Sequence, residues 1–175
     1  MSKTRIAVAG AGSIGLAHMA LAQRSASCTL CAVVDPSPAA RAHAEQAGVP
    51  WHPSLAALFE ADRPNGMIVA KPNALHVPHA LECIEAGVAV LLEKPIVTTL
   101  DEGERLVQIA EQTGAKLLIG HHRAHSAIMA KAREVVAQGV LGKLVAVMGS
   151  ATFSSPTTTL HRRPGGARSV PGRSC

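Results

Sequence analysis

Residues 6–15 read Ile6-Ala-Val-Ala-Gly-Ala-Gly-Ser-Ile-Gly15, and no other segment constrains the architecture of this chain as strongly. An apolar strand leads into the pattern Gly10-x-Gly12-x-x-Gly15, and a helix rich in Ala and Leu follows at once. Gly10 permits a tight turn, Gly12 lets a pyrophosphate approach the backbone, and Gly15 allows helix and strand to pack closely. The helix would direct its free N–H groups at the phosphates. The segment therefore predicts a dinucleotide-binding loop.

Asp35 follows the next apolar run and lies twenty residues beyond Gly15. A carboxylate at this distance is placed to accept hydrogen bonds from the ribose diol of an adenosine. Its charge would repel a 2′-phosphate, and the nearest following basic residue is Arg41, on the next predicted helix. We therefore predict NAD as the cofactor, with NADP as the alternative. A second interpretation, in which Asp35 is only the N-cap of that helix, stays open.

Apolar runs alternate with helical patterns along the chain, which is typical of βαβ units in an α/β fold. We predict a doubly wound parallel sheet with strand order 3-2-1-4-5-6. The predicted strands cover residues 5–9, 29–34, 50–52, 66–70, 88–92 and 116–119. The predicted helices cover residues 14–24, 37–47, 54–61, 75–86, 100–113 and 126–138, and Thr99 and Glu102 form a capping box for one of them.

Composition excludes several classes of protein. The chain has 175 residues, 47% of them hydrophobic, which suits one globular domain or one domain with part of another. No apolar run approaches the roughly 18 residues of a membrane span, and no signal-peptide pattern precedes the first strand. We therefore expect a cytoplasmic protein without a membrane partner. Cys28 and Cys31 would point to opposite faces of a strand, so they suit neither a metal nor a redox pair.

The formal charge of +5 comes from the end of the chain. All 12 acidic residues and 13 of the 17 basic residues precede residue 151. The excess is carried by Arg162, Arg163, Arg168 and Arg173. Because the chain also has no Tyr and only two Phe to stack on bases, we predict no nucleic-acid partner.

Three further segments follow predicted strands at the carboxyl edge of the sheet, where open α/β sheets bind ligands. They read Ala-Lys-Pro-Asn-Ala-Leu-His at 70–76, Leu-Leu-Glu-Lys-Pro at 91–95 and Gly-His-His-Arg-Ala-His at 120–125. With the glycine loop, the Pro-Asn-x-x-His and Glu-Lys-Pro segments make residues 4–150 resemble the Gfo/Idh/MocA oxidoreductase family. The resemblance implies a Rossmann domain for NAD(P), followed by an α+β domain.

The resemblance also implies roles for individual residues. Cofactor contacts are implied for Gly10, Gly12, Ser13, Ile14, Gly15, Asp35, Pro72, Asn73, His76, Glu93 and Lys94. Substrate contacts are implied for Lys94, His122 and Arg123. The implied reaction is hydride transfer between a nicotinamide and a hydroxyl-bearing carbon of a sugar, cyclitol or related polyol. Lys94 is the implied catalytic residue, since its charge would favour alkoxide character as the hydroxyl loses its proton.

Lys71 and the histidines at positions 121, 122 and 125 lie in the segments that follow the predicted strands. Lys71 stands where the family usually has Thr, and it would steer anionic ligands, crowd the nicotinamide or point into solvent. The histidines at positions 121, 122 and 125 have a spacing that suits a metal site, but such a cluster at a strand end is more often a loop with one substrate contact. We predict no metal.

The predicted organisation has three parts: a dinucleotide-binding domain at 1–122, a crossover helix with the first strand of a truncated second domain at 123–151, and a disordered basic tail at 152–175. No acidic residue follows Glu134, and the only later histidine is His161. One hypothesis is therefore a truncation or frameshift near residue 155, which would leave a non-catalytic dinucleotide-binding module. The other is an active oxidoreductase. The unpaired strand predicted at 143–151 would also favour self-association.

Overall fold

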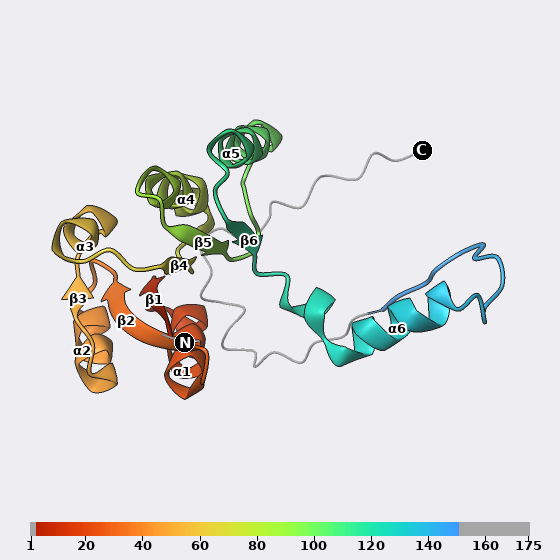
Figure 1. Cartoon of the computed structure of the whole chain (residues 1–175), viewed down its shortest axis with the longest axis horizontal. Coiled ribbons are helices and arrows are strands. Elements are labelled where there is room, and N and C mark those ends of the chain that lie inside the picture. The colour runs from red at the N-terminus through yellow and green to blue at the C-terminus, as the bar shows by residue number, and fades with distance from the viewer. Residues whose placement is uncertain (1–2, 151–175) are drawn as a thin grey trace, which may run out of the picture. The chain divides into compact units, whose positions relative to one another are not determined.

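The computed structural model describes residues 3–150 (Figure 1). The chain divides into two compact units, Met1–Ala130 and Lys131–Cys175. This division falls later than the predicted boundary at residue 122, and the predicted tail at 152–175 lies outside the described residues. No helix of the described part is long and apolar enough to cross a membrane.

Six parallel strands form one sheet in the order β3-β2-β1-β4-β5-β6, which confirms the predicted topology. The strands are β1 (Thr4–Ala9), β2 (Cys28–Val34), β3 (Trp51–His52), β4 (Gly66–Val69), β5 (Ala89–Leu92) and β6 (Leu117–Ile119). The direction in which strands are added reverses at β1: β2 and β3 lie on one flank of β1, and β4, β5 and β6 lie on its other flank. The carboxyl ends of β1, β2 and β4 therefore lie next to one another, which is where such sheets bind ligands.

The helices also match the predicted ranges to within about two residues. They are α1 (Ser13–Arg24), α2 (Pro38–Ala47), α3 (Leu55–Ala61), α4 (His76–Glu85), α5 (Leu100–Thr113) and α6 (Ala127–Ala137), with short 3-10 helices η1 (Asn73–Leu75) and η2 (His122–His125). The capping box at the start of α5 is present: Thr99 accepts from the Glu102 N–H, and the Glu102 carboxylate accepts in return. Gly48 and Gly114 end α2 and α5 in the left-handed conformation.

Successive side chains of a strand point to opposite faces of the sheet, so the core is divided between these two faces. Ala7, Ala9 and Val69 pack on the side covered by α3, α4 and α5. Val8 and Ile68 pack on the opposite side, against α1 and α2. Figure 1 shows the same arrangement, with α1 and α2 on one side of the strands and α3, α4 and α5 on the other. This burial of both faces explains why the strands are apolar throughout.

The strand predicted at 143–151 is wrong over its described part, because residues 144–150 have no regular secondary structure. Val145, Val147 and Met148 are 91%, 85% and 97% exposed. A strand needs a hydrogen-bonded neighbour to satisfy its backbone groups, and this segment has none among the described residues. The apolar pattern of this segment therefore does not by itself produce a strand.

Candidate cofactor site at the carboxyl edge of the sheet

The three loop glycines differ in what surrounds them. Gly10 has a φ of +104°, and a Cβ there would overlap the carbonyl oxygen of Ala70. A Cβ at Gly15 would overlap the carbonyl oxygen of Gly10. At Gly12, by contrast, no atom lies within 4 Å of the position that a Cβ would take. Gly10 and Gly15 are therefore required by packing, whereas Gly12 leaves open space of the kind that a pyrophosphate needs.

The amino terminus of α1 opens onto this space. Gly12 is the N-cap, and no side chain caps the helix. Ser13 is exposed, and the Ile14 side chain is 52% exposed although it is apolar. The first N–H groups of a helix lack partners within the helix and carry its positive dipole end. The loop therefore fits the phosphates of a dinucleotide.

Asp35 lies beside the loop, where β2 ends. Its Oδ2 atom accepts a hydrogen bond from the Ala11 N–H at 3.1 Å, and its Oδ1 atom accepts from the Ser37 N–H at 2.9 Å. Burial alone would raise the pKa of the Asp35 carboxyl, but these hydrogen bonds and the charge of Lys71 lower the pKa below its ordinary value. The N-cap of α2 is Ser37, so the interpretation of Asp35 as that N-cap is wrong.

Lys71 reaches the same carboxylate from the end of β4. Its Nζ atom lies 3.3 Å from Oδ2 of Asp35, and its side chain is only 7% exposed. The alternative in which Lys71 points into solvent is therefore wrong. Arg41, the basic residue nearest to Asp35 along the chain, pairs instead with Glu45 at 3.1 Å and lies 6.0 Å from the ring centre of Trp51. Lys71 is thus a cation held beside Asp35.

His76 holds two loops of the site together. It is 1% exposed, its Nε2 atom lies 2.8 Å from the carbonyl oxygen of Lys71, and its Nδ1 atom lies 2.7 Å from that of Pro95. Both ring nitrogens are thus already engaged by the protein, and the contact with the cofactor stays a prediction. We therefore treat His76 as a positioning residue that fixes the Lys71 loop against the Lys94–Pro95 loop.

Glu93 is likewise engaged within the protein. Its Oε1 atom lies 2.8 Å from Nε2 of His18 on α1, and its Oε2 atom accepts from the Lys94 N–H at 3.3 Å. A Cβ at Gly120 would lie 2.8 Å from Oε1, so the glycine leaves room for this carboxylate. Lys94 itself is exposed, beside a cis peptide bond to Pro95. Glu93 therefore fixes the base of the loop that presents Lys94.

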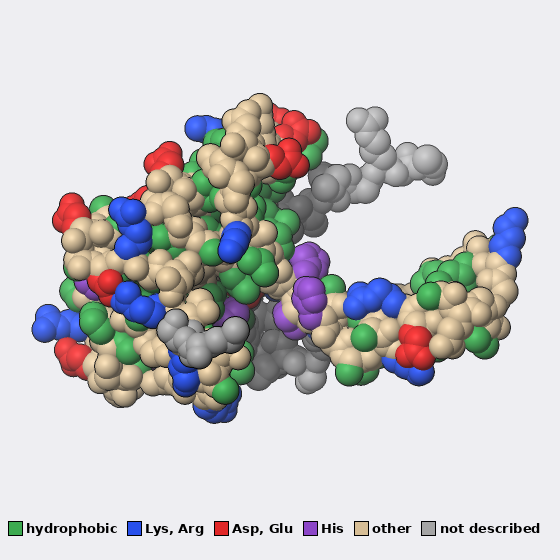
Figure 2. Space-filling model, viewed as in Figure 1, with side chains coloured by type: hydrophobic (Ala, Val, Ile, Leu, Met, Phe, Trp, Pro, Cys, Tyr) green, Lys and Arg blue, Asp and Glu red, His purple; other side chains and the backbone are tan. Residues whose placement is uncertain are grey.

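The remaining predicted site residues are all exposed. Pro72 and Asn73 lie at η1, whereas His122 and Arg123 lie at η2, after β6. Figure 2 shows a group of histidine side chains at the surface in the segment after β6. Within residues 3–150, no three His, Cys, Asp or Glu side chains are arranged to hold a metal ion. Cys28 and Cys31 are free thiols.

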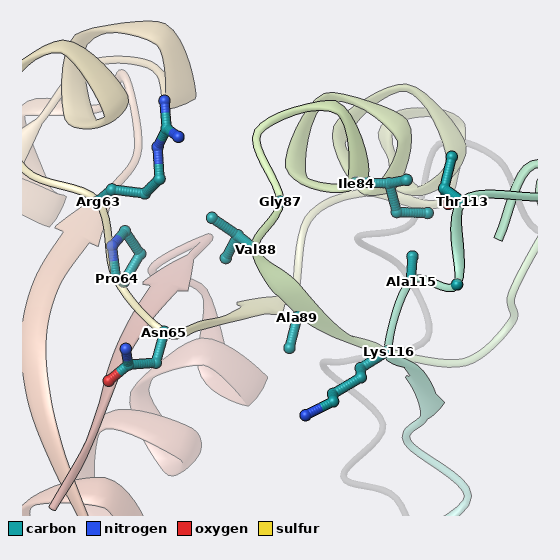
Figure 3. A pocket seen from close by; sticks show the side chains of 11 residues that line it. Arg63, Pro64, Asn65, Ile84, Gly87, Val88, Ala89, Thr113, Ala115 and Lys116 are labelled. Carbon is teal, nitrogen blue, oxygen red and sulfur yellow. The ribbon is translucent and has the colours of Figure 1, made fainter. Parts of the chain in front are cut away.

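A cavity of about 630 Å³ lies at the opposite edge of the sheet, before the starts of β4, β5 and β6 (Figure 3). Its polar lining includes Arg63, Asn65 and Lys116. Figure 3 shows that the side chains of Arg63 and Lys116 extend in different directions, so their charges do not converge on one point. Ligand sites combine a concave surface with converging polar groups. We therefore place the site at the carboxyl edge, around Asp35 and the glycine loop.

Sequence reasoning missed two features of this site. The first is His18, the partner of Glu93; it lies one helical turn after Gly15, on the face of α1 that turns toward the sheet. The second is the partner of Lys71. The predicted strand order places the ends of β2 and β4 on either side of β1, so a long side chain after β4 is able to reach Asp35. That topological signal was present in the sequence.

The fold is that of a Rossmann domain, the class of domain that binds dinucleotides, and comparison with known proteins agrees. A family model described as an oxidoreductase family with an NAD-binding Rossmann fold matches residues 4–121. The chain therefore belongs to the Gfo/Idh/MocA oxidoreductase family, and this domain is its NAD-binding Rossmann domain.

Relatives extend the comparison along the chain. The rhizopine catabolism protein MocA of Rhizobium meliloti is 28% identical over 166 residues, which cover 95% of this chain and 52% of that protein. An inositol 2-dehydrogenase of Arthrobacter sp. is 32% identical over 146 residues, covering 81% of this chain and 43% of that protein. The chain thus spans about half the length of these relatives.

Solved structures agree on the fold. The WlbA dehydrogenase of Bordetella pertussis, in complex with NADH and UDP-GlcNAcA, matches with a TM-score of 0.74 at 26% identity, covering 81% of this chain and 44% of that chain. A scyllo-inositol dehydrogenase of Lactobacillus casei, with NAD(H) and scyllo-inositol bound, has a TM-score of 0.76 at 22% identity, covering 81% and 43%. The second likeness supports the fold alone.

Proposed function

We propose that this chain forms the cofactor-binding part of an NAD(P)-dependent oxidoreductase acting on a hydroxyl-bearing carbon of a cyclitol, sugar or related polyol. The observation that carries the proposal is a connected set of contacts along the carboxyl edge of the sheet. Ala11 contacts Asp35, and Asp35 contacts Lys71. His76 then joins Lys71 to Pro95, directly after Lys94. The same edge thus carries a dinucleotide loop and an exposed lysine.

The residues of this edge fit the cofactor that the family implies, because Gly12 leaves space and the start of α1 is uncapped. NAD(P) would supply the hydride acceptor. Lys94 would donate a hydrogen bond to the substrate oxygen, and its positive charge would stabilise alkoxide character while the hydroxyl proton leaves. His122 and Arg123, exposed on η2, are proposed to contact the substrate. The named activity of the inositol dehydrogenase relatives supports a polyol.

Lys94→Met tests the proposal. We expect the parent chain to reduce NAD or NADP when incubated with myo-inositol, scyllo-inositol or related polyols. The Lys94→Met variant should have a kcat lowered by about 100- to 10,000-fold, because it loses a charge that stabilises the reacting oxygen. Absorbance of the reduced nicotinamide measures both rates. Lys116→Met, at the opposite edge of the sheet, is the matched control and should retain the parent rate. Equal and measurable turnover in all three proteins would contradict the role of Lys94.

A second candidate function is a module that binds the dinucleotide without turnover. The observation that favours it is that Glu93 contacts His18 and that both ring nitrogens of His76 lie against carbonyl oxygens, so neither side chain is free to act as a general base. The same assays separate the two candidates. NADH binding with no turnover on any polyol would support the module, whereas turnover that depends on Lys94 would exclude it.

A further inference from the structure

The carboxylate of Asp35 has a cation beside it, contributed by Lys71 at the end of β4. A lone carboxylate at this position favours NAD, because it accepts hydrogen bonds from the ribose diol and repels a 2′-phosphate. Here Nζ of Lys71 lies 3.3 Å from Oδ2 of Asp35. The two side chains are 7% and 17% exposed, so the pair is largely shielded from solvent. Lys71 comes from β4, 36 residues after Asp35.

The backbone of Lys71 is held in place from two sides. Gly10 packs against the preceding Ala70 carbonyl group so closely that a Cβ at Gly10 would overlap it. On the other side, Nε2 of His76 lies 2.8 Å from the Lys71 carbonyl oxygen. The ammonium group is therefore presented from a fixed point of the chain, next to the glycine loop. A group that is positioned in advance loses less conformational freedom when a ligand binds.

The charges of the pair change what the adenosine end of the site can bind. The positive charge of Lys71 offsets the negative charge of Asp35, so an incoming phosphate would not meet an isolated carboxylate. The Lys71 ammonium has three N–H donors and Asp35 takes one of them, which leaves donors for a phosphate oxygen. Arg41 is more exposed than Lys71: its side chain is 66% exposed, pairs with Glu45 at 3.1 Å and lies 6.0 Å from the ring centre of Trp51.

We propose that Lys71 makes the adenosine end of this site accept the 2′-phosphate of NADP as well as the ribose diol of NAD. Asp35 binds the diol when the ribose is unphosphorylated, and Lys71 binds the phosphate when it is present. The inference deepens the proposed function by naming the cofactor range of the same site. It rests only on dinucleotide binding, so an absence of turnover would leave it unaffected.

Calorimetric titration with NADH and NADPH tests this inference on the full chain. The parent chain should bind the two dinucleotides with Kd values that differ by less than about tenfold. Lys71→Met and Lys71→Gln should each weaken NADPH at least about tenfold more than NADH, the effect expected when a hydrogen bond to a charged group is lost. Lys71→Arg should retain NADPH binding, because it keeps the charge.

Lys116→Met is the matched control: it removes one exposed lysine at the opposite edge of the sheet and should leave the ratio of the two Kd values unchanged. The fluorescence of Trp51, the only tryptophan, confirms that each variant is folded, since its Nε1 atom donates to the Asp35 carbonyl oxygen at 2.8 Å. A parent chain that binds NADH but binds NADPH over about 100-fold more weakly would overturn the inference. Equal weakening of both dinucleotides by Lys71→Met would also overturn it. Absence of binding to either would overturn the dinucleotide site itself.

Discussion

Replacing Gly12 by alanine should weaken NADH binding by about 10- to 100-fold, the cost expected when a methyl group intrudes into a tight contact. The fold should tolerate the change, because no atom lies within 4 Å of the new Cβ and Gly12 has a φ of −74°, which alanine adopts freely. Calorimetric titration gives the affinity, and thermal unfolding gives the stability. An unchanged Kd for NADH would mean that the pyrophosphate does not lie against Gly12.

Gly15→Ala is the matched contrast within the same loop. Its Cβ would overlap the backbone carbonyl oxygen of Gly10, which cannot move aside as a flexible side chain does. Alanine is the better helix former by up to about 1 kcal/mol, but overlap of this kind costs about 1–3 kcal/mol. We therefore expect Gly15→Ala to lose both stability and NADH binding, whereas Gly12→Ala loses only binding. A Gly15→Ala variant as stable as the parent would contradict the packing described for α1.

The second large effect is expected at His76. His76→Leu should lower the free energy of unfolding by about 1–3 kcal/mol, because the buried imidazole no longer lies against the carbonyl oxygens of Lys71 and Pro95. That loss is a large part of the stability of a typical domain. Urea unfolding followed by Trp51 fluorescence measures it, since the chain has one tryptophan. A change below about 1 kcal/mol would show that His76 does not hold the two loops.

His79 is the control for His76, one turn further along α4. It is half-buried, and its Nδ1 atom has no hydrogen-bond partner among the described residues. His79→Leu should therefore change the stability by less than about 1 kcal/mol, because its Nδ1 atom has no partner to lose among the described residues. Burial, followed by the charge of Lys71, lowers the pKa of His79 below 6.5.

Because the pKa of His79 is lowered in the folded chain, the free energy of unfolding should depend on pH. The unfolded chain binds this proton more readily than the folded one, so the parent should lose stability as the pH falls below about 6.5. The His79→Leu variant should lose less over the same interval, and equal slopes would contradict this account.

Much of the fold could be predicted because it depends on local patterns. The first strand was expected at 5–9 and runs Thr4–Ala9, and even the short β3 was expected at 50–52. Glycines with fixed spacing, alternating apolar runs and helix caps all act within a few residues of one another. The strand predicted at 143–151 shows the limit of such patterns, because strand formation depends on a partner that the segment itself does not contain.

The site was predictable in its components but not in its contacts. The glycine loop, Asp35 and the Lys94 segment could be identified from local motifs. The ion pair between Lys71 and Asp35 and the contact of His18 with Glu93 join residues 36 and 75 positions apart. Such contacts depend on strand order and on side-chain direction, which spacing along the chain does not specify. His76 illustrates the same point, because its place in a motif predicts a ligand contact but does not reveal that its ring lies against the carbonyl oxygens of Lys71 and Pro95.

The most direct test of the dinucleotide site is titration of the full chain with NADH. Trp51 lies at the site through its hydrogen bond to Asp35, so its fluorescence should be quenched as NADH binds. We predict saturable binding of one NADH per chain with a Kd of roughly micromolar magnitude, together with matching heat in calorimetry. A folded chain that shows neither quenching nor heat at NADH concentrations on the order of 1 mM would contradict the assignment of the carboxyl edge as a cofactor site.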